Sequence, residues 1–242
     1  IEVNHLVKQY GTFRAVNDLS FTVEPGQIYG FLGPNGAGKS TTMNIMTGYL
    51  SATSGTVRIA GHEMLLEPEE AKRHIGYLPE IPPVYPDMTP REYLRFAGEL
   101  KGVARGKLEA EVERVMELTG ITSMHRRLIG NLSKGYRQRV GVSCALLGDP
   151  EVIILDEPTV GLDPRQILDI RDLIRSLGGD HTVILSSHIL SEVSAVCDHV
   201  LILSGGKLVA QGTPAELERL MRRSNRSHML VQGTPEGVRA AL

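Results

Sequence analysis

Gly33-Pro34-Asn35-Gly36-Ala37-Gly38-Lys39-Ser40-Thr41 is the stretch that decides the fold, because it fits the phosphate-loop pattern of Gly, four residues, Gly, Lys and then Ser or Thr. Glycines let such a loop adopt positive φ and point successive backbone N–H groups at a phosphate. A helix that begins near Lys39 adds the positive end of its dipole. Lys39 is expected to reach the β- and γ-phosphates, and the Ser40 hydroxyl to hold Mg²⁺. The stretch therefore predicts a nucleotide site that binds through residues 33–41.

The sequence on either side of the loop favours this site over a simple glycine-rich turn. Residues 27–32 predict a short buried strand, and residues 41–46 continue as a helix. A phosphate loop needs this order of strand, loop and helix. Tyr10, which closes an earlier strand beside Gly11, could stack on a purine, although an aromatic residue at a strand end is more often part of the core.

Composition limits the class of protein. The chain has 242 residues, enough for one large α/β domain and a fragment of something else, with 41% hydrophobic and 22% charged residues. A formal net charge of −2 gives no electrostatic argument for nucleic acid. No apolar run approaches the roughly 18 residues needed to cross a bilayer, and no secretory signal opens the chain. We therefore expect a soluble, cytoplasmic chain, with Cys144 and Cys197 as reduced core cysteines.

The order of the predicted elements indicates an α/β protein with a helical insertion. Prolines at 82, 83, 86 and 90 forbid regular structure before the insertion, which is predicted at residues 90–147 without any strand. Capping-box patterns start helices at Thr89 and Thr213. The predicted strands are 1–10, 19–23, 27–32, 56–59, 75–78, 152–155, 182–185, 199–203 and 207–210, and the predicted helices are 41–46, 67–74, 90–101, 107–118, 133–147, 165–177, 189–196 and one that begins at 213.

A polar break separates the end of the chain from this pattern. We expect one ATP-binding domain over residues 1–217, then the rest of the final helix and a linker within 218–242. Residues 229–242 predict one strand and one helix, which cannot bury a core of their own. They are interpreted as the start of a partial accessory domain.

A second nucleotide motif follows the apolar strand at residues 152–155. That strand delivers Asp156 and Glu157 to its carboxyl end, where ligands bind in a parallel sheet. Asp156 is expected to hold Mg²⁺ directly or through water, and Glu157 to accept the proton of a water that attacks the γ-phosphate. The alternative is an acidic turn after a buried strand, which the upstream phosphate loop disfavours.

Residues 132–139, Leu-Ser-Lys-Gly-Tyr-Arg-Gln-Arg, resemble the signature of the nucleotide-binding subunits of ATP-binding cassette (ABC) transporters, in particular the exporter-type group. The resemblance covers roughly residues 1–217, and its specificity lies in the order of the motifs. These are Tyr10, the phosphate loop, Glu80, the signature at 132–136, Asp156-Glu157, Gly161-Leu162-Asp163 and His188. It implies a phosphate-loop NTPase core with a parallel sheet, an N-terminal antiparallel β-subdomain and an inserted α-helical subdomain.

The resemblance also implies roles for residues outside the two nucleotide motifs. In a head-to-tail dimer, Ser133 and Gly135 would bind the γ-phosphate of the ATP held by the partner, and Lys134, where the family usually has Gly, would add a positive charge. Tyr136 replaces a usual Gln. Glu80 stands where the family usually carries a Gln that approaches Mg²⁺ and the attacking water, with a surface carboxylate as the alternative.

Two further positions belong to the same resemblance. His188 would contact the γ-phosphate and position the water, although a lone His is more often structural. Asp163 would link the two sites of the dimer, with a simple helix cap before Pro164 as the alternative. Its loop departs from the family's Ser-Ala-Leu-Asp at Val160 and Gly161.

The function that this implies is an ATP-hydrolysing subunit that binds ATP and Mg²⁺, forms a homodimer, and drives a separate membrane-spanning permease. It would sit on the inner face of the cell membrane through that partner, with no role for nucleic acid. The Pro-rich loop and the helical insertion would receive the partner, with Tyr85 as a contact candidate. The alternative is a non-transport ABC ATPase acting as a clamp or regulatory switch, but the chain lacks the long coiled-coil insertion or second cassette usual there. A GTP-binding switch would need an Asn-Lys-x-Asp motif, which is absent.

Overall fold

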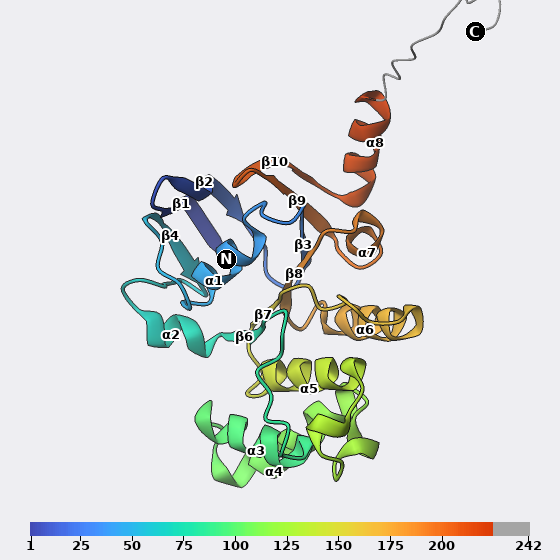
Figure 1. Cartoon of the computed structure of the whole chain (residues 1–242). Helices are drawn as coiled ribbons and strands as arrows, with labels where there is room; N and C mark the ends of the chain where they lie inside the picture. Colours follow the sequence, from blue (N-terminus) through green and yellow to red (C-terminus); the bar gives the residue numbers. More distant parts are fainter. Residues whose placement is uncertain (225–242) are drawn as a thin grey trace, which may run out of the picture.

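A six-stranded sheet forms the centre of the protein in this computed structural model, which describes residues 1–224 and the side chains of residues 1–220 (Figure 1). The prediction for residues 229–242 lies outside the described residues. The strand order is β10-β9-β3-β8-β7-β6, and all neighbouring pairs are parallel except β9 with β10. The strands are β3 (Ile28–Leu32), β6 (Ile75–Leu78), β7 (Val152–Leu155), β8 (Thr182–Ser187), β9 (His199–Ser204) and β10 (Lys207–Gly212). The predicted parallel sheet is confirmed, with an antiparallel strand at one edge.

The two faces of this sheet pack against different cores. In β7, the side chains of Ile153 and Leu155 belong to a core shared with the helical layer, whereas Val152 and Ile154 belong to a core shared with the antiparallel sheet. Successive side chains of a strand point to opposite faces, so a continuous apolar run is required here. Each strand therefore holds its carboxyl end in a fixed place between two packed layers.

The N-terminal antiparallel sheet covers one side. Its order is β2-β1-β4-β5, with β1 (Glu2–Tyr10), β2 (Phe13–Thr22), β4 (Ser54–Ile59) and β5 (His62–Glu63). The prediction of a strand starting at Leu19 was too short, because β2 already begins at Phe13 opposite Tyr10. The predicted strand 56–59 was too short, because β4 already begins at Ser54, and β5 was missed. Arg14, Asn17 and Asp18 interrupt the apolar residues of β2, and its first half is recognised from its pairing with β1.

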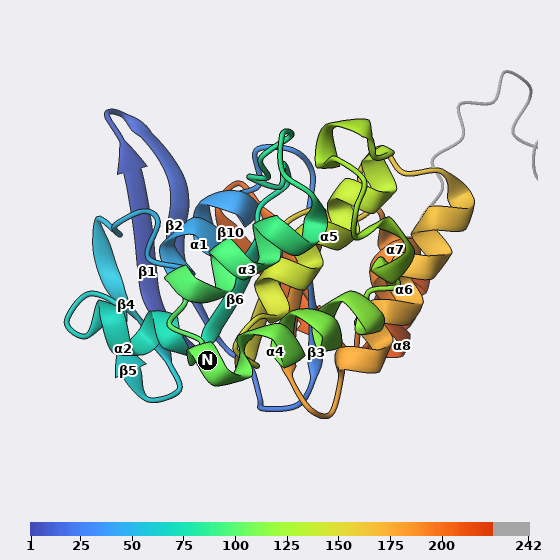
Figure 2. The same ribbon diagram turned by 90° about the horizontal axis from the view of Figure 1, so that it is seen from below.

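The helical insertion lies at the opposite end of the molecule from α8 (Pro214–Ser224). It contains α3 (Pro90–Leu100), α4 (Arg105–Leu118) and α5 (Lys134–Leu146), and Figure 2 shows these helices in front of the sheet. Thr89 starts α3 with the expected capping box: its backbone N–H donates to Glu92 Oε2 at 2.8 Å, and the Glu92 N–H donates to Thr89 Oγ1 at 3.3 Å. Two 3₁₀ turns, Thr122–Met124 and Ile129–Asn131, were not predicted.

The remaining helices lie beside the central sheet. They are α1 (Lys39–Met46), α2 (Pro68–Arg73), α6 (Pro164–Leu177) and α7 (Leu190–Ser194). Helix α7 is shorter than the predicted 189–196. It packs closely on β3 at Gly30, where a Cβ would lie 2.1 Å from the Val193 side chain. Cys197, beside it, is buried and free, and burial with nearby Asp198 raises the pKa of its thiol to about 12. Cys144 is also free, but only half-buried.

The helices bear on two further predictions, the end of the ATP-binding domain and the absence of a membrane span. Helix α8 runs across residue 217, so the predicted end of the ATP-binding domain stays a prediction. Within residues 1–224, no helix combines the length and apolar character that a membrane span requires.

Candidate nucleotide-binding site

The phosphate loop connects β3 to α1 and has the backbone that its glycines allow. Gly38 is the N-cap of α1 in a left-handed conformation with φ 103°, and a Cβ there would lie 2.7 Å from the Ala15 carbonyl oxygen. Its own carbonyl accepts bonds from the Thr42 N–H at 2.9 Å and the Thr42 hydroxyl at 2.8 Å. Only glycine fits this position, and the amino end of α1 faces the loop as an anion site requires.

The Lys39 side chain folds back over the loop. Its ammonium donates to the carbonyl oxygens of Gly33 at 2.7 Å and Pro34 at 3.3 Å, and it lies 3.5 Å from Glu157 Oε1. Only 6% of Lys39 is exposed. A buried ammonium needs such partners, and these fix its charge at the centre of the loop. The positive charge is therefore placed where phosphate oxygens can reach it.

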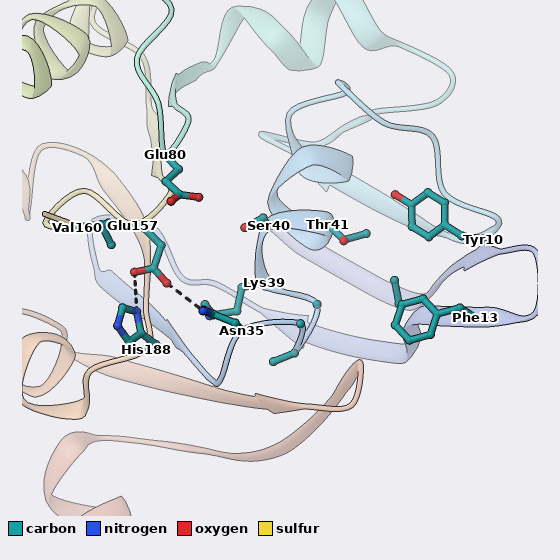
Figure 3. Close-up of a pocket in the computed structure, with 14 residues that line it drawn as sticks. Tyr10, Phe13, Asn35, Lys39, Ser40, Thr41, Glu80, Glu157, Val160 and His188 are labelled. Atoms are coloured by element: carbon teal, nitrogen blue, oxygen red, sulfur yellow. Dashed lines mark hydrogen bonds and ion pairs between the residues drawn. The ribbon is translucent and has the colours of Figure 1, made fainter.

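Glu157 brings the second motif to the same point. One carboxylate oxygen faces Lys39, and the other lies 3.1 Å from His188 Nδ1, as Figure 3 shows. Glu157 is 7% exposed and has a φ of 47°, in a region that a bulky side chain rarely adopts. Backbone strain of this kind is often found at functional sites, where the surroundings hold it. The tertiary structure thus places Lys39, Glu157 and His188 in one row.

Asp156 lies beneath this row and is 4% exposed. Its Oδ1 accepts a 2.6 Å bond from the Ser186 hydroxyl, whose oxygen in turn accepts the Glu157 backbone N–H at 2.8 Å. Burial and then the Asp156 charge raise the pKa of Tyr77 to about 12, and the Tyr77 hydroxyl donates to Asn44 on α1 at 3.0 Å. Tyr77 therefore lies on the side of the sheet that carries the phosphate-loop helix.

A pocket of about 390 Å³ is lined by Lys39, Glu157 and His188 and also by two aromatic residues. Tyr10 and Phe13 face each other across the turn between β1 and β2 and are 49% and 63% exposed. Figure 3 shows both rings at the side of the pocket away from Glu157. Neither ring is core, so both offer a flat apolar surface to a base. The pocket is lined by Tyr10, Phe13, Ala15, residues 35–41, Glu80, Glu157, Val160 and His188.

Other residues proposed for the site do not line this pocket. Gly33 and Pro34 contribute only the carbonyl oxygens that bind Lys39. Ser133 is the N-cap of α5 and accepts the Tyr136 N–H at 3.4 Å. Lys134 borders a second cavity of about 350 Å³, which also touches Glu80 and Val160. Gly135 and Asp163 border a third cavity. Within one chain, the signature residues therefore do not line the same pocket as the phosphate loop.

Asp163 has a visible structural role. It is the N-cap of α6, and its Oδ1 accepts the Gln166 backbone N–H at 2.9 Å. In the loop before it, a Cβ on Gly161 would lie 2.2 Å from the Lys134 ammonium nitrogen. Two of the departures from the usual ABC pattern, Lys134 and Gly161, thus occupy adjacent space.

Sequence reasoning missed Phe13 and Ser186. Phe13 had a signal, because an aromatic residue stands on each side of the short turn at Gly11, but its strand was not recognised. Ser186 had only a weak signal, a hydroxyl near the end of the apolar strand β8. Its partners, Asp156 and Glu157, are about thirty residues away in the sequence and meet it only through strand pairing.

The chain is similar to known proteins over most of its length. Residues 16–160 match the family model described as ABC transporter. The bacitracin transport ATP-binding protein BcrA of Bacillus licheniformis is 40% identical over 87% of this chain and 69% of its own length. The linearmycin resistance ATP-binding protein LnrL of Bacillus subtilis (strain 168) is 35% identical over 90% of this chain and 70% of its own. The solved structure of cbiO1 from Clostridium perfringens, part of the transporter complex cbiONQ, is 25% identical with a TM-score of 0.82, and the match covers 93% of both chains.

Proposed function

The chain belongs to the ABC transporter family as an ATP-binding, ATP-hydrolysing subunit, and on that premise we propose that two copies form a head-to-tail dimer that drives a separate membrane-spanning partner. The observation that supports the hydrolytic role is the row of Lys39, Glu157 and His188 along the wall of the phosphate-loop pocket.

In this proposal, ATP binds with its phosphates on residues 33–41 and its base against Tyr10, with Phe13 as a second apolar surface. Backbone N–H groups of the loop and the α1 dipole stabilise the negative charge. The Lys39 ammonium contacts the β- and γ-phosphates. Because Lys39 already faces Glu157 at 3.5 Å, the bound γ-phosphate would lie beside the carboxylate.

Hydrolysis then requires a water that is activated next to the γ-phosphate. Glu157 accepts the proton of that water, and His188, whose Nδ1 lies 3.1 Å from Glu157, orients the carboxylate and contacts the γ-phosphate. The strained backbone of Glu157 and its burial keep the acceptor oxygen in place.

The oxygen-bearing side chains at the pocket suit a Mg²⁺ ion that is bound mainly through the nucleotide phosphates. Ser40 and Glu80 face the pocket with oxygen atoms, the ligands Mg²⁺ prefers, and Asp156 is held nearby by Ser186. Among residues 1–224, no group of three or more His, Cys, Asp or Glu side chains could hold a metal by itself. Ser40, Glu80 and Asp156 would therefore hold Mg²⁺ together with ATP. The ion would neutralise charge on the β- and γ-phosphates.

Glu80 gives a prediction about this ion. Glutamate has the side-chain oxygen of the usual Gln but adds a negative charge, which Mg²⁺ compensates and a metal-free nucleotide does not. Glu80→Gln is expected to keep hydrolysis and to make ATP affinity less dependent on Mg²⁺, whereas Glu80→Ala should reduce hydrolysis and coupling to the membrane partner together. The measurement is ATP affinity against Mg²⁺ concentration. Superimposable curves for the parent and the Gln variant would support a surface carboxylate without this role.

The dimer explains why the signature lies away from the phosphate loop within one chain. Ser133 caps α5 and Gly135 lies in its first turn, so the Ser133 hydroxyl and the Gly135 N–H would donate to the partner's γ-phosphate, with Lys134 adding charge. Asp163, which also caps α6, would contact the partner's site from the adjacent loop. We propose a homodimer because one chain supplies both halves of the site.

Ser133→Arg tests the dimer. The larger side chain would fill the γ-phosphate position of the partner, so we expect normal ATP binding by the monomer and no ATP-induced dimer. Size-exclusion chromatography with Mg²⁺-free ATP measures both states. Ser123→Arg, the same change at an exposed residue of the insertion, is the matched control and should dimerise normally. Dimerisation of the Ser133 variant at the parent's ATP concentration would contradict the sandwich.

The proposed membrane partner would dock on the helical insertion and the loop before it. Tyr85 is 48% exposed and makes edge contacts with Tyr93 and Phe96, which gives this surface an aromatic cluster. The chain would then be cytoplasmic and peripheral on the inner face of the membrane. Names of relatives such as the Nod factor export ATP-binding protein I support export as the direction. Isolating the membrane protein that co-purifies with this chain tests the proposal.

A further inference from the structure

Glu192 is a buried carboxylate that has no role in the hydrolysis proposed for Lys39, Glu157 and His188. It lies on the short helix α7 and is 8% exposed. Among the side chains of residues 1–220, none that carries a positive charge forms an ion pair with Glu192. A buried carboxylate is costly unless donors satisfy it, and an apolar residue could fill the same space at lower cost. A carboxylate at this buried position therefore points to a role other than packing.

The donors to Glu192 come from two segments at the carboxyl ends of β7 and β8, namely the loop after β7 and the last residue of β8. Its Oε2 accepts a 2.6 Å bond from the Thr159 hydroxyl and a 3.1 Å bond from the Ser187 hydroxyl. Both donors are buried, at 7% and 1% exposed. A hydroxyl has one proton to donate, and the hydroxyls of Thr159 and Ser187 both donate theirs to Glu192 Oε2. Glu192 thus links the segment after β7 to the end of β8, which are not adjacent in sequence.

The same two segments carry Glu157 and His188, the pair proposed to act in hydrolysis. Thr159 comes two residues after Glu157, and Ser187 immediately precedes His188. Ser187 Oγ also accepts the Ile189 backbone N–H at 3.1 Å, which fixes the chain on the other side of His188. The distance between Glu157 Oε2 and His188 Nδ1, 3.1 Å, depends on both segments staying in place.

We propose that Glu192 is a positioning residue for hydrolysis, whose carboxylate joins Thr159 to Ser187 and thereby holds Glu157 against His188. The proposal rests on the roles given above to Glu157 and His188. It requires an accepting oxygen at position 192, and it involves neither the phosphate loop nor the aromatic side of the pocket. Loss of Glu192 should therefore lower kcat and leave ATP affinity unchanged.

The test compares Glu192→Ala with Glu192→Gln in the transporter assembled with its membrane partner. The Ala variant is expected to lower kcat by about tenfold or more, since small displacements of reacting groups cost rates of this order, with ATP affinity within about twofold of the parent. The Gln variant keeps one accepting oxygen for both hydroxyls and should restore kcat to within about threefold. An equal loss in both variants would overturn the proposal, as would an Ala variant with the parent's kcat.

A second pair of variants separates positioning from stability. Thr159→Val keeps the shape of the side chain but removes one donor, so it should also lower kcat. If its effect passes through Glu192, the double variant with Glu192→Ala is no slower than Glu192→Ala alone, whereas additive losses would contradict the link. Thr159→Val alone decides the matter if the Ala variant does not fold, because a parent-like kcat would then overturn the proposal.

Ser143→Ala is the control for a purely structural hydroxyl. Ser143 of α5 is buried in a 2.7 Å bond with Thr119 at the end of α4, and neither residue lines the phosphate-loop pocket. It should lower the melting temperature and leave kcat unchanged. Failure of the Glu157 role is distinguishable, because Glu157→Gln would then retain turnover whatever the Glu192 variants do.

Discussion

Glu157→Gln is expected to abolish ATP turnover while ATP binding persists. The amide keeps the shape of the side chain and its contact with His188 but cannot accept a proton, so hydrolysis should fall on the order of a hundredfold or more. The substitution also removes the negative charge 3.5 Å from the Lys39 ammonium, which leaves that ammonium freer for the nucleotide. ATP affinity should therefore be equal or higher, and the variant should accumulate as an ATP-bound dimer.

The measurement is steady-state ATPase activity with the membrane partner present, together with nucleotide affinity. Glu151→Gln is the matched control, because Glu151 stands at the other end of β7, largely exposed and 3.0 Å from His74. The same chemical change there should leave turnover unaltered. Near-normal activity of the Glu157 variant would show that another group accepts the proton.

Lys39→Ala is expected to lose ATP affinity. The ammonium is buried and bonded to the loop carbonyls of Gly33 and Pro34, so its removal takes away the central charge of the site and two bonds that hold the loop. Hydrogen bonds to charged groups contribute about 1.5–3 kcal/mol each, which corresponds to a loss of roughly tenfold to a hundredfold in affinity. Titration calorimetry with Mg²⁺-ATP measures this loss directly.

Lys101→Ala is the control for removing a lysine that binds backbone carbonyls. The Lys101 ammonium donates to the carbonyl oxygens of Cys144 at 2.8 Å, Ala145 at 3.0 Å and Leu147 at 3.2 Å, at the carboxyl end of α5. Its loss should lower stability without changing ATP affinity. If the two lysine variants weaken ATP binding equally, the effect at Lys39 is general destabilisation and not a lost phosphate contact.

Local chemistry let the sequence predict much of this protein. Glycines at positions 36 and 38, followed by Lys39, specify a loop backbone and a charge that need no distant partner. The apolar strand before Asp156 and the capping boxes at Thr89 and Thr213 are likewise short-range patterns, and the structure has each of them. The fold class and the phosphate-loop pocket follow from such patterns in order along the chain.

The contacts between distant segments were decided only by the tertiary structure. Pairing of β7 with β8 brings Glu157 to His188 and Ser186 to Asp156, across about thirty residues of sequence. Pairing of β1 with β2 makes Phe13 part of the pocket. Helix α7 brings Glu192 into contact with Thr159, in the loop after β7, and with Ser187, at the end of β8. Side-chain hydroxyls and carboxylates have no periodic pattern that marks their partners, so strand register and packing alone determine which of them meet.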